Sequence, residues 1–90
     1  MNAYTVDNSR AAWEIRKNAI ALESRRAGDV APGDHVRFNN AHVRVVRDVV
    51  AENGKVKIFV HDSNGMWWLD ADHMLDIVAE SVPVGVGWVR

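Results

Sequence analysis

The stretch from residue 32 to residue 78 constrains the fold most, because short runs rich in Val, Ile and aromatic residues are separated there by turn-forming residues. Alternation is clearest at residues 55–62, where one face takes Val56, Ile58 and Val60 and the other takes Lys57, Phe59 and His61. The sequence predicts five short strands in this stretch, at residues 35–39, 42–51, 55–62, 66–69 and 75–78.

The turns and one irregularity follow from the same pattern. Asn53-Gly54 and Asn64-Gly65 predict two tight hairpin turns, because both residue types tolerate the positive φ that such turns require. The strand at 42–51 begins with Val43 and Val45 inward and Arg44 outward. Its alternation then slips at Val46-Arg47, and we expect a β-bulge there because one extra residue changes the phase.

Both flanks of this stretch are predicted to be ordered. The first segment, Asp7 to Ala27, is predicted to form a helix that Gly28 ends, because small and apolar residues recur along it at helical spacing. The tail at residues 80–90 alternates through Val82, Val84, Val86 and Trp88, and Pro83 restricts it to an edge strand. We therefore expect one structural domain made of a helix (1–29), a β-region (30–79) and an extended tail (80–90).

The β-region resembles the small SH3-like barrels, including the KOW and Tudor-like modules. The resemblance covers residues 30–78, and its carriers are Pro32-Gly33-Asp34 with Val36 and Phe38, the two Asn-Gly turns, and the closing Leu75-Asp76-Ile77-Val78. It implies a mainly β fold with an N-terminal α-helix: a five-stranded SH3-like barrel followed by an edge-strand tail. Folds of this kind host many unrelated functions, so the resemblance does not name a partner.

Two features depart from the specialised members of that group. A KOW module carries a Lys-Gly-x-x-Gly-like stretch after its first strand, whereas residues 39–46 here are NNAHVRVV, so a ribosomal or transcription-type role is not predicted. Tudor-like binding of methylated side chains needs an aromatic cage, for which Phe59, Trp67 and Trp68 are available. Adjacent residues of a strand point to opposite faces, so one tryptophan at most lines a given pocket.

Composition bounds the class of protein. Ninety residues make one small domain, and the absence of cysteine excludes disulfides and thiolate metal sites. No signal segment or long apolar run is evident, which predicts a cytoplasmic protein. The first 60 residues carry ten Lys/Arg and seven Asp/Glu, whereas the last 30 carry one and five. The preference for Arg over Lys, with abundant Val and Ala, is typical of a GC-rich genome such as that of an actinobacterium or its phage.

The first functional hypothesis is a non-enzymatic protein-binding or adaptor module that also associates with a second copy of itself. Trp13 and Ile20 share a side of the predicted helix away from its main apolar stripe. Exposed tryptophans are common anchors at protein interfaces, and an edge strand can add to a partner's sheet. The candidate partner-binding residues are Trp13, Ile20, Trp67, Val84, Val86 and Trp88. Packing of these residues against the β-region is the alternative interpretation.

The second hypothesis is a nucleic-acid-binding accessory protein. Cations and flat rings alternate on the outward positions of the first three predicted strands, and phosphates and bases require both kinds of group. The candidate residues are Arg37, Arg44, Arg47, Lys55, Lys57, Phe59 and His61. A solvated outer face that protects the strands from aggregation is the alternative interpretation, and the net charge of −1 favours it.

Catalysis, cofactors and metals are not predicted. The four histidines have no spacing typical of metal ligands. Asp70, Asp72 and Asp76 form an acidic group near the last predicted strand, but no nucleophile or phosphate-binding loop accompanies them. We expect no enzyme activity, no cofactor and no membrane contact.

Overall fold

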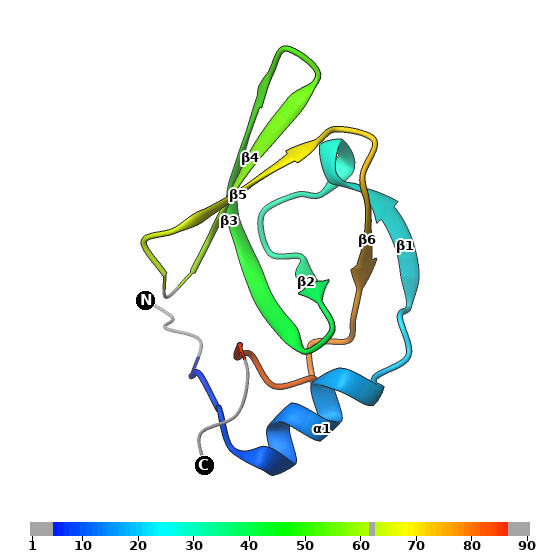
Figure 1. Cartoon of the computed structure of the whole chain (residues 1–90), viewed down its shortest axis with the longest axis vertical. Coiled ribbons are helices and arrows are strands. Elements are labelled where there is room, and N and C mark those ends of the chain that lie inside the picture. The colour runs from blue at the N-terminus through cyan, green and yellow to red at the C-terminus, as the bar shows by residue number, and fades with distance from the viewer. Residues whose placement is uncertain (1–4, 62, 87–90) are drawn as a thin grey trace.

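The structure is a computed structural model, and it describes residues 5–61 and 63–86. Within these residues one helix and six strands follow each other along the chain, with a single 3₁₀ turn η1 (Ala27–Asp29) after the first strand. The elements are α1 (Arg10–Asn18), β1 (Glu23–Arg26), β2 (His35–Asn39), β3 (His42–Glu52), β4 (Lys55–Val60), β5 (Met66–Asp70) and β6 (Met74–Ile77). The protein is thus mainly β with one helix, as predicted (Figure 1).

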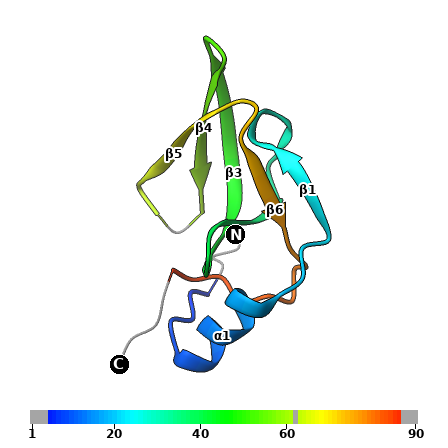
Figure 2. The same ribbon diagram turned by 45° about the vertical axis from the view of Figure 1, so that its right-hand side comes forward.

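The six strands form one antiparallel sheet in the order β1-β6-β2-β3-β4-β5. Strand β3 is long because it serves two neighbours: its first part pairs with β2 and its second part with β4. The register shifts between Val46 and Asp48, which confirms the predicted bulge. The β3–β4 hairpin projects beyond the other strands, away from α1 (Figure 2). Its turn has positive φ at Asn53 (53°) and Gly54 (78°), as the sequence predicts.

The predicted helix over Asp7 to Ala27 is wrong in its second half. Helix α1 begins after Ser9, whose hydroxyl accepts a bond from the Ala12 N–H, and it ends at Ala19, whose ψ of 133° is extended. The guanidinium of Arg37, on β2, donates to the carbonyls of Arg16 and Ala19 and so satisfies the end of the helix. The following residues pair with β6 to form β1, because pairing at the free edge of β6 overrides the local helix propensity of Ala, Leu, Glu and Arg.

The closed five-stranded barrel implied by the resemblance is not what the structure shows. The five predicted strands are present as β2 to β6, and β6 returns to pair with β2. A sixth strand, β1, occupies the free side of β6, and the sheet stays open with β1 and β5 at its edges in the described part of the chain. The physical reason is that β1 pairs with the main-chain N–H and C=O groups on the free side of β6, so this side is no longer available to another strand of the sheet.

The main core lies inside the curved sheet. Its buried residues include Val36, Phe38, Ile58 and Leu75, and the inward positions of β4 are Val56, Ile58 and Val60, as the alternation predicts. Trp67 packs against this core, and its ring stacks on Phe38 with centroids 4.6 Å apart. The neighbouring Trp68 is 59% exposed, so the two tryptophans face opposite sides as predicted.

A buried arginine joins the segment before α1 to the turn between β2 and β3. In its described part, residues 80–86, the tail forms isolated bridges, Val84 to Val6 and Gly85 to Val43, instead of the edge strand that the sequence predicts. Arg16 is fully buried there, and it donates from Nε to the Ala41 carbonyl (2.7 Å) and from Nη1 to the Asp7 carbonyl (2.6 Å). A Cβ at position 85 would lie 2.5 Å from Nη1 of Arg16, so this close approach requires glycine.

Candidate functional site

The candidate site is the solvent side of β3, β4 and β5, which we call the outer face. Residues directly opposite each other on neighbouring strands share a face, so the register places side chains in rows across the sheet. Val50, Lys57 and Trp68 form the central row. Asp48, Phe59 and Met66 form the row on one side of it, and Glu52, Lys55 and Asp70 form the row on the other.

The outer face exposes apolar side chains. Trp68 is 59% exposed, and Val50 and Met66 are 44% and 43% exposed. Phe59 lies between them on β4 and is half-buried. The guanidinium of Arg47, at the bulge of β3, lies 5.7 Å from the centre of the Phe59 ring. The exposed apolar and aromatic side chains thus alternate with cations: Lys57 lies between Val50 and Trp68, and the Lys55 ammonium lies 5.8 Å from the centre of the Trp68 ring. Aromatic residues and arginine are enriched at protein interfaces.

The charges of the outer face are largely satisfied within it. Lys55 Nζ lies 2.7 Å from the Asp70 carboxylate, and Lys57 Nζ lies 3.5 Å from that of Glu52. The Lys55 partner holds the pKa of Asp70 below its usual value, first through the hydrogen bond and then through charge attraction. Within residues 5–61 and 63–86, Arg47 takes part in none of the ion pairs. Arg47 is therefore the cation of this face that remains available to a partner.

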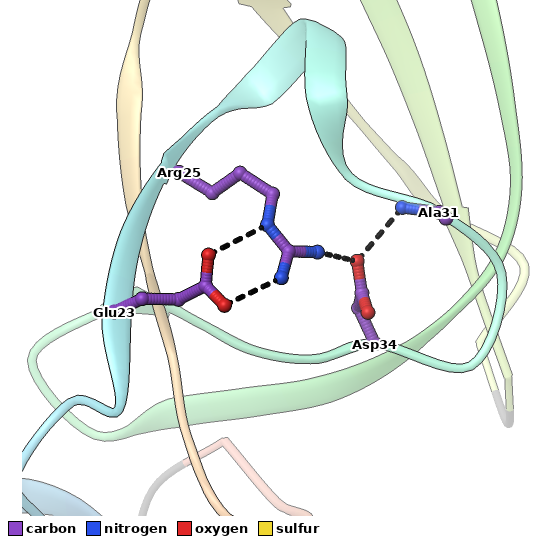
Figure 3. A network of polar contacts seen from close by, with 4 residues as sticks. All are labelled: Glu23, Arg25, Ala31 and Asp34. Carbon is purple, nitrogen blue, oxygen red and sulfur yellow. Dashed lines mark hydrogen bonds and ion pairs between the residues drawn. The ribbon is translucent and has the colours of Figure 1, made fainter.

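The two edges of the sheet differ sharply in chemistry. Strand β1 reads Glu-Ser-Arg-Arg, and Arg25 bonds to both Glu23 (2.8 Å) and Asp34 (2.6 Å), whose carboxylate also accepts the Ala31 N–H (Figure 3). This network ties the edge to the following loop and surrounds it with charge, which discourages strand addition. Strand β5 reads Met-Trp-Trp-Leu-Asp, with one charge at its end.

The structure separates the residues predicted for nucleic-acid binding. Arg47, Lys55, Lys57 and Phe59 share the outer face, and His61 lines a pocket of about 390 Å³ with Arg47, Val60, Ser63 and Asn64. Arg37 lies elsewhere: its side chain is 13% exposed and binds Asp76 at 2.8 Å as well as the end of α1. Arg44 is half-buried on the first part of β3, opposite Val36.

The residues predicted to bind a protein partner are also dispersed. Ile20 is 88% exposed beyond the end of α1, whereas Trp13 is half-buried, with the Lys17 ammonium 4.3 Å from its ring centre. Val84 is buried against the N-terminal segment and Val86 is exposed. Trp67 packs into the core, and Trp88 lies outside the described residues.

Three residues of the outer face are absent from the predicted partner-binding set: Val50, Met66 and Trp68. The missing signal is the register of the β4–β5 hairpin. The tight turn predicted at Asn64-Gly65 is wrong, because positive φ among the described residues is confined to Gly33, Asn53 and Gly54, and residues 61–65 separate the two strands. A hairpin register that sets Trp68 opposite Lys57 places it outward, since Lys57 is outward by alternation. The choice between the two tryptophans thus needed the register of the hairpin.

A second aromatic group lies on the other side of the sheet. The His42 ring meets Phe38 and Trp67 edge-on, with centroids 6.3 and 4.8 Å away. Burial, together with the charges of Arg44 and Arg16, lowers the pKa of His42 below 6.5. In the described part of the chain, no three His, Asp or Glu side chains are grouped as a metal ion requires.

No helix among residues 5–61 and 63–86 has the length and apolar character to span a membrane. Comparison of the chain with protein-family models, with curated proteins and with solved structures finds no match.

Proposed function

We propose that this protein is a non-enzymatic protein-binding module and that the outer face is its docking surface. The occupant is a protein segment that sets apolar side chains against Trp68 and Met66 and a carboxylate against Arg47. The observation that carries the proposal is the exposure of Trp68, Met66 and Val50 in neighbouring rows of one rigid sheet. Large aromatic side chains on a rigid element are the usual anchors of protein interfaces.

Charge favours a protein over a nucleic acid on this face. The face carries Arg47, Lys55 and Lys57, and it carries an equal number of carboxylates at Asp48, Glu52 and Asp70. Two of its lysines already hold carboxylate partners, so phosphates would have to displace those pairs. Nucleic-acid affinity depends on releasing counterions from many phosphates, which requires unpaired cations. A nucleic-acid ligand is therefore the alternative that the test must distinguish from a protein ligand.

The test is selection from a random peptide library displayed on phage, with the intact chain as bait. The selected peptides should combine apolar and acidic residues. Trp68→Ala should weaken their binding about 30-fold, since interface tryptophans contribute about 2 kcal/mol or more. Arg47→Glu should remove the preference for acidic residues. Titration calorimetry with one selected synthetic peptide gives both effects.

Ile20→Ala is the matched control, because Ile20 is an even more exposed apolar residue that lies outside the outer face. It should leave the affinity unchanged. Equal losses for Trp68→Ala and Ile20→Ala would refute the assignment of the site. Fluorescence anisotropy with labelled single-stranded DNA and RNA, at low and moderate salt, tests the alternative. Salt-sensitive binding that survives Trp68→Ala but not a combined Arg47→Glu and Lys57→Glu change would replace the protein-binding proposal.

A further inference from the structure

We propose that β5 pairs with β5 of a second copy of this chain, antiparallel about a two-fold axis at Trp68. The inference goes beyond the proposed function, because it concerns the main chain at the edge of the sheet, whereas a partner would dock on the side chains of its outer face. In the described part of the chain, β5 pairs with β4 on one side and has no strand on the other. An apolar strand with an open edge is a template for adding another strand.

The sequence of β5 is compatible with pairing to itself. Antiparallel pairing about Trp68 sets Met66 of one copy opposite Asp70 of the other, and Trp67 opposite Leu69. All five residues of the strand are paired in this register, and no like charges meet. Trp67 and Leu69 point inward in both copies and Trp68 points outward, so each pair shares one face of the combined sheet.

The other edge of the sheet offers no equivalent. Pairing of β1 with itself in the corresponding way would set Glu23 opposite Arg26 and Ser24 opposite Arg25. Arg25 would have to release the carboxylates of Glu23 and Asp34, which it holds at 2.8 and 2.6 Å (Figure 3). Arg26 is likewise engaged, with Asp29 at 3.0 Å and Asp72 at 3.4 Å. Among the described residues, the charged contacts of β5 are limited to Lys55, which pairs with Asp70 at the strand's end and lies 5.8 Å from the centre of the Trp68 ring.

Such pairing would join the two outer faces into one. The row of Phe59 and Met66 in one copy continues into Asp70 and Lys55 of the other, and Trp68 stands beside its counterpart. The Arg47 guanidinium, which lies over the Phe59 ring, is then on the same row as Met66 and the Asp70 carboxylate of the second copy. A strand of five residues buries less area than a standard interface, so the dimer is expected to be weak and to depend on concentration.

Cysteine cross-linking tests the register, because the natural chain has no cysteine. Met66→Cys and Asp70→Cys are prepared separately, one with a size tag, then mixed and mildly oxidised. Directly opposite residues have Cα atoms about 4.5–5.5 Å apart, which a disulfide spans. In the same register, residue 66 of one copy and residue 66 of the other are offset by four residues along the strands, or about 13 Å. A disulfide does not span that distance. The mixed disulfide should form at least about tenfold faster than either symmetric one.

Ser24→Cys, on β1, is the control for random collision, and it should cross-link no faster than the symmetric products. Mixed and symmetric disulfides forming at equal rates would overturn the proposed register. Absence of the mixed product at high protein concentration, with both variants folded by circular dichroism, would overturn the pairing itself. Neither outcome bears on peptide binding by Trp68 in the monomer, so failure of the dimer and failure of the proposed function are distinguishable.

Discussion

Replacement of Arg16 by methionine should destabilise the fold far more than replacement of the neighbouring Lys17. The Arg16 side chain is fully buried, and it holds the carbonyls of Ala41 and Asp7 at 2.7 and 2.6 Å. Methionine keeps the length and apolar stem of the side chain but has no donor. The carbonyl acceptors belong to the main chain and stay in place, so the variant leaves them without this donor.

The expected cost follows from these two bonds. A hydrogen bond from a charged donor contributes about 1.5–3 kcal/mol, and removal of a buried charge from its partners recovers part of its desolvation cost. We therefore expect a net loss of roughly 2–4 kcal/mol, against a total stability of about 4–13 kcal/mol for a chain of this length. For a domain of this size, that loss corresponds to a fall in Tm of roughly 10–30 °C.

Urea unfolding followed by tryptophan fluorescence measures the effect, with Lys17→Met as the matched control. Lys17 is the next residue of α1, and its exposed ammonium contacts only the face of Trp13 at 4.3 Å among the interactions described. Its replacement should cost about 0.5–1 kcal/mol. Equal losses for the two variants would refute the role given to Arg16. Should Arg16→Met fail to fold, Arg16→Lys provides the comparison: it keeps the charge but not the two-carbonyl geometry, and its loss should still exceed that of Lys17→Met.

Two further predictions concern pH and salt. The folded-state pKa of His42 is lowered by burial, and its unfolded value is about 6.5, so the stability it contributes is present above pH 6.5 and is lost as pH falls through the folded pKa. His42→Gln should flatten the stability–pH curve below pH 6.5 in urea titrations, and an unchanged slope would contradict this. Arg25→Met should lower the free energy of unfolding at low salt, and 1 M NaCl should reduce the difference, because the network around Arg25 is partly exposed. A loss that is independent of salt would point to packing of the side chain instead.

The local pattern of apolar and turn-forming residues was sufficient to predict most of the strands. The strands β2 to β6 are visible in the sequence because their alternation, their turns and the bulge at Val46-Arg47 are properties of neighbouring residues. Strand β1 was missed because Glu23–Arg26 has no apolar alternation and exists by virtue of its pairing with β6, some 50 residues away. The early end of α1 has the same origin, since the donor that satisfies its last carbonyls is Arg37 on β2.

The outer face was predictable only in part, for a reason of register. Lys57 and Phe59 were assigned outward correctly from the alternation of their own strand. The prediction selected Trp67, whereas Trp68 is the outward tryptophan. Choosing Trp68 needed the pairing across the β4–β5 turn, because a shift of one residue exchanges the two faces. Arg37 illustrates a different limit. Its outward position in the pattern was clear, but its engagement with Asp76 and the end of α1 depends on contacts between distant segments.

The two edges of the sheet bear on function together. A small open sheet must prevent its edges from pairing at random, and charged side chains are a common means. Strand β1 uses that means, through Arg25 and Arg26 and their carboxylate partners. Strand β5 could carry the same protection at Met66 and Trp68, whose side chains reach solvent and contribute little to the core. Exposed apolar residues at these two positions therefore lower solubility without a matching gain in packing. This difference between a charged edge at β1 and an apolar edge at β5 is expected if β5 and the outer face bind a protein partner.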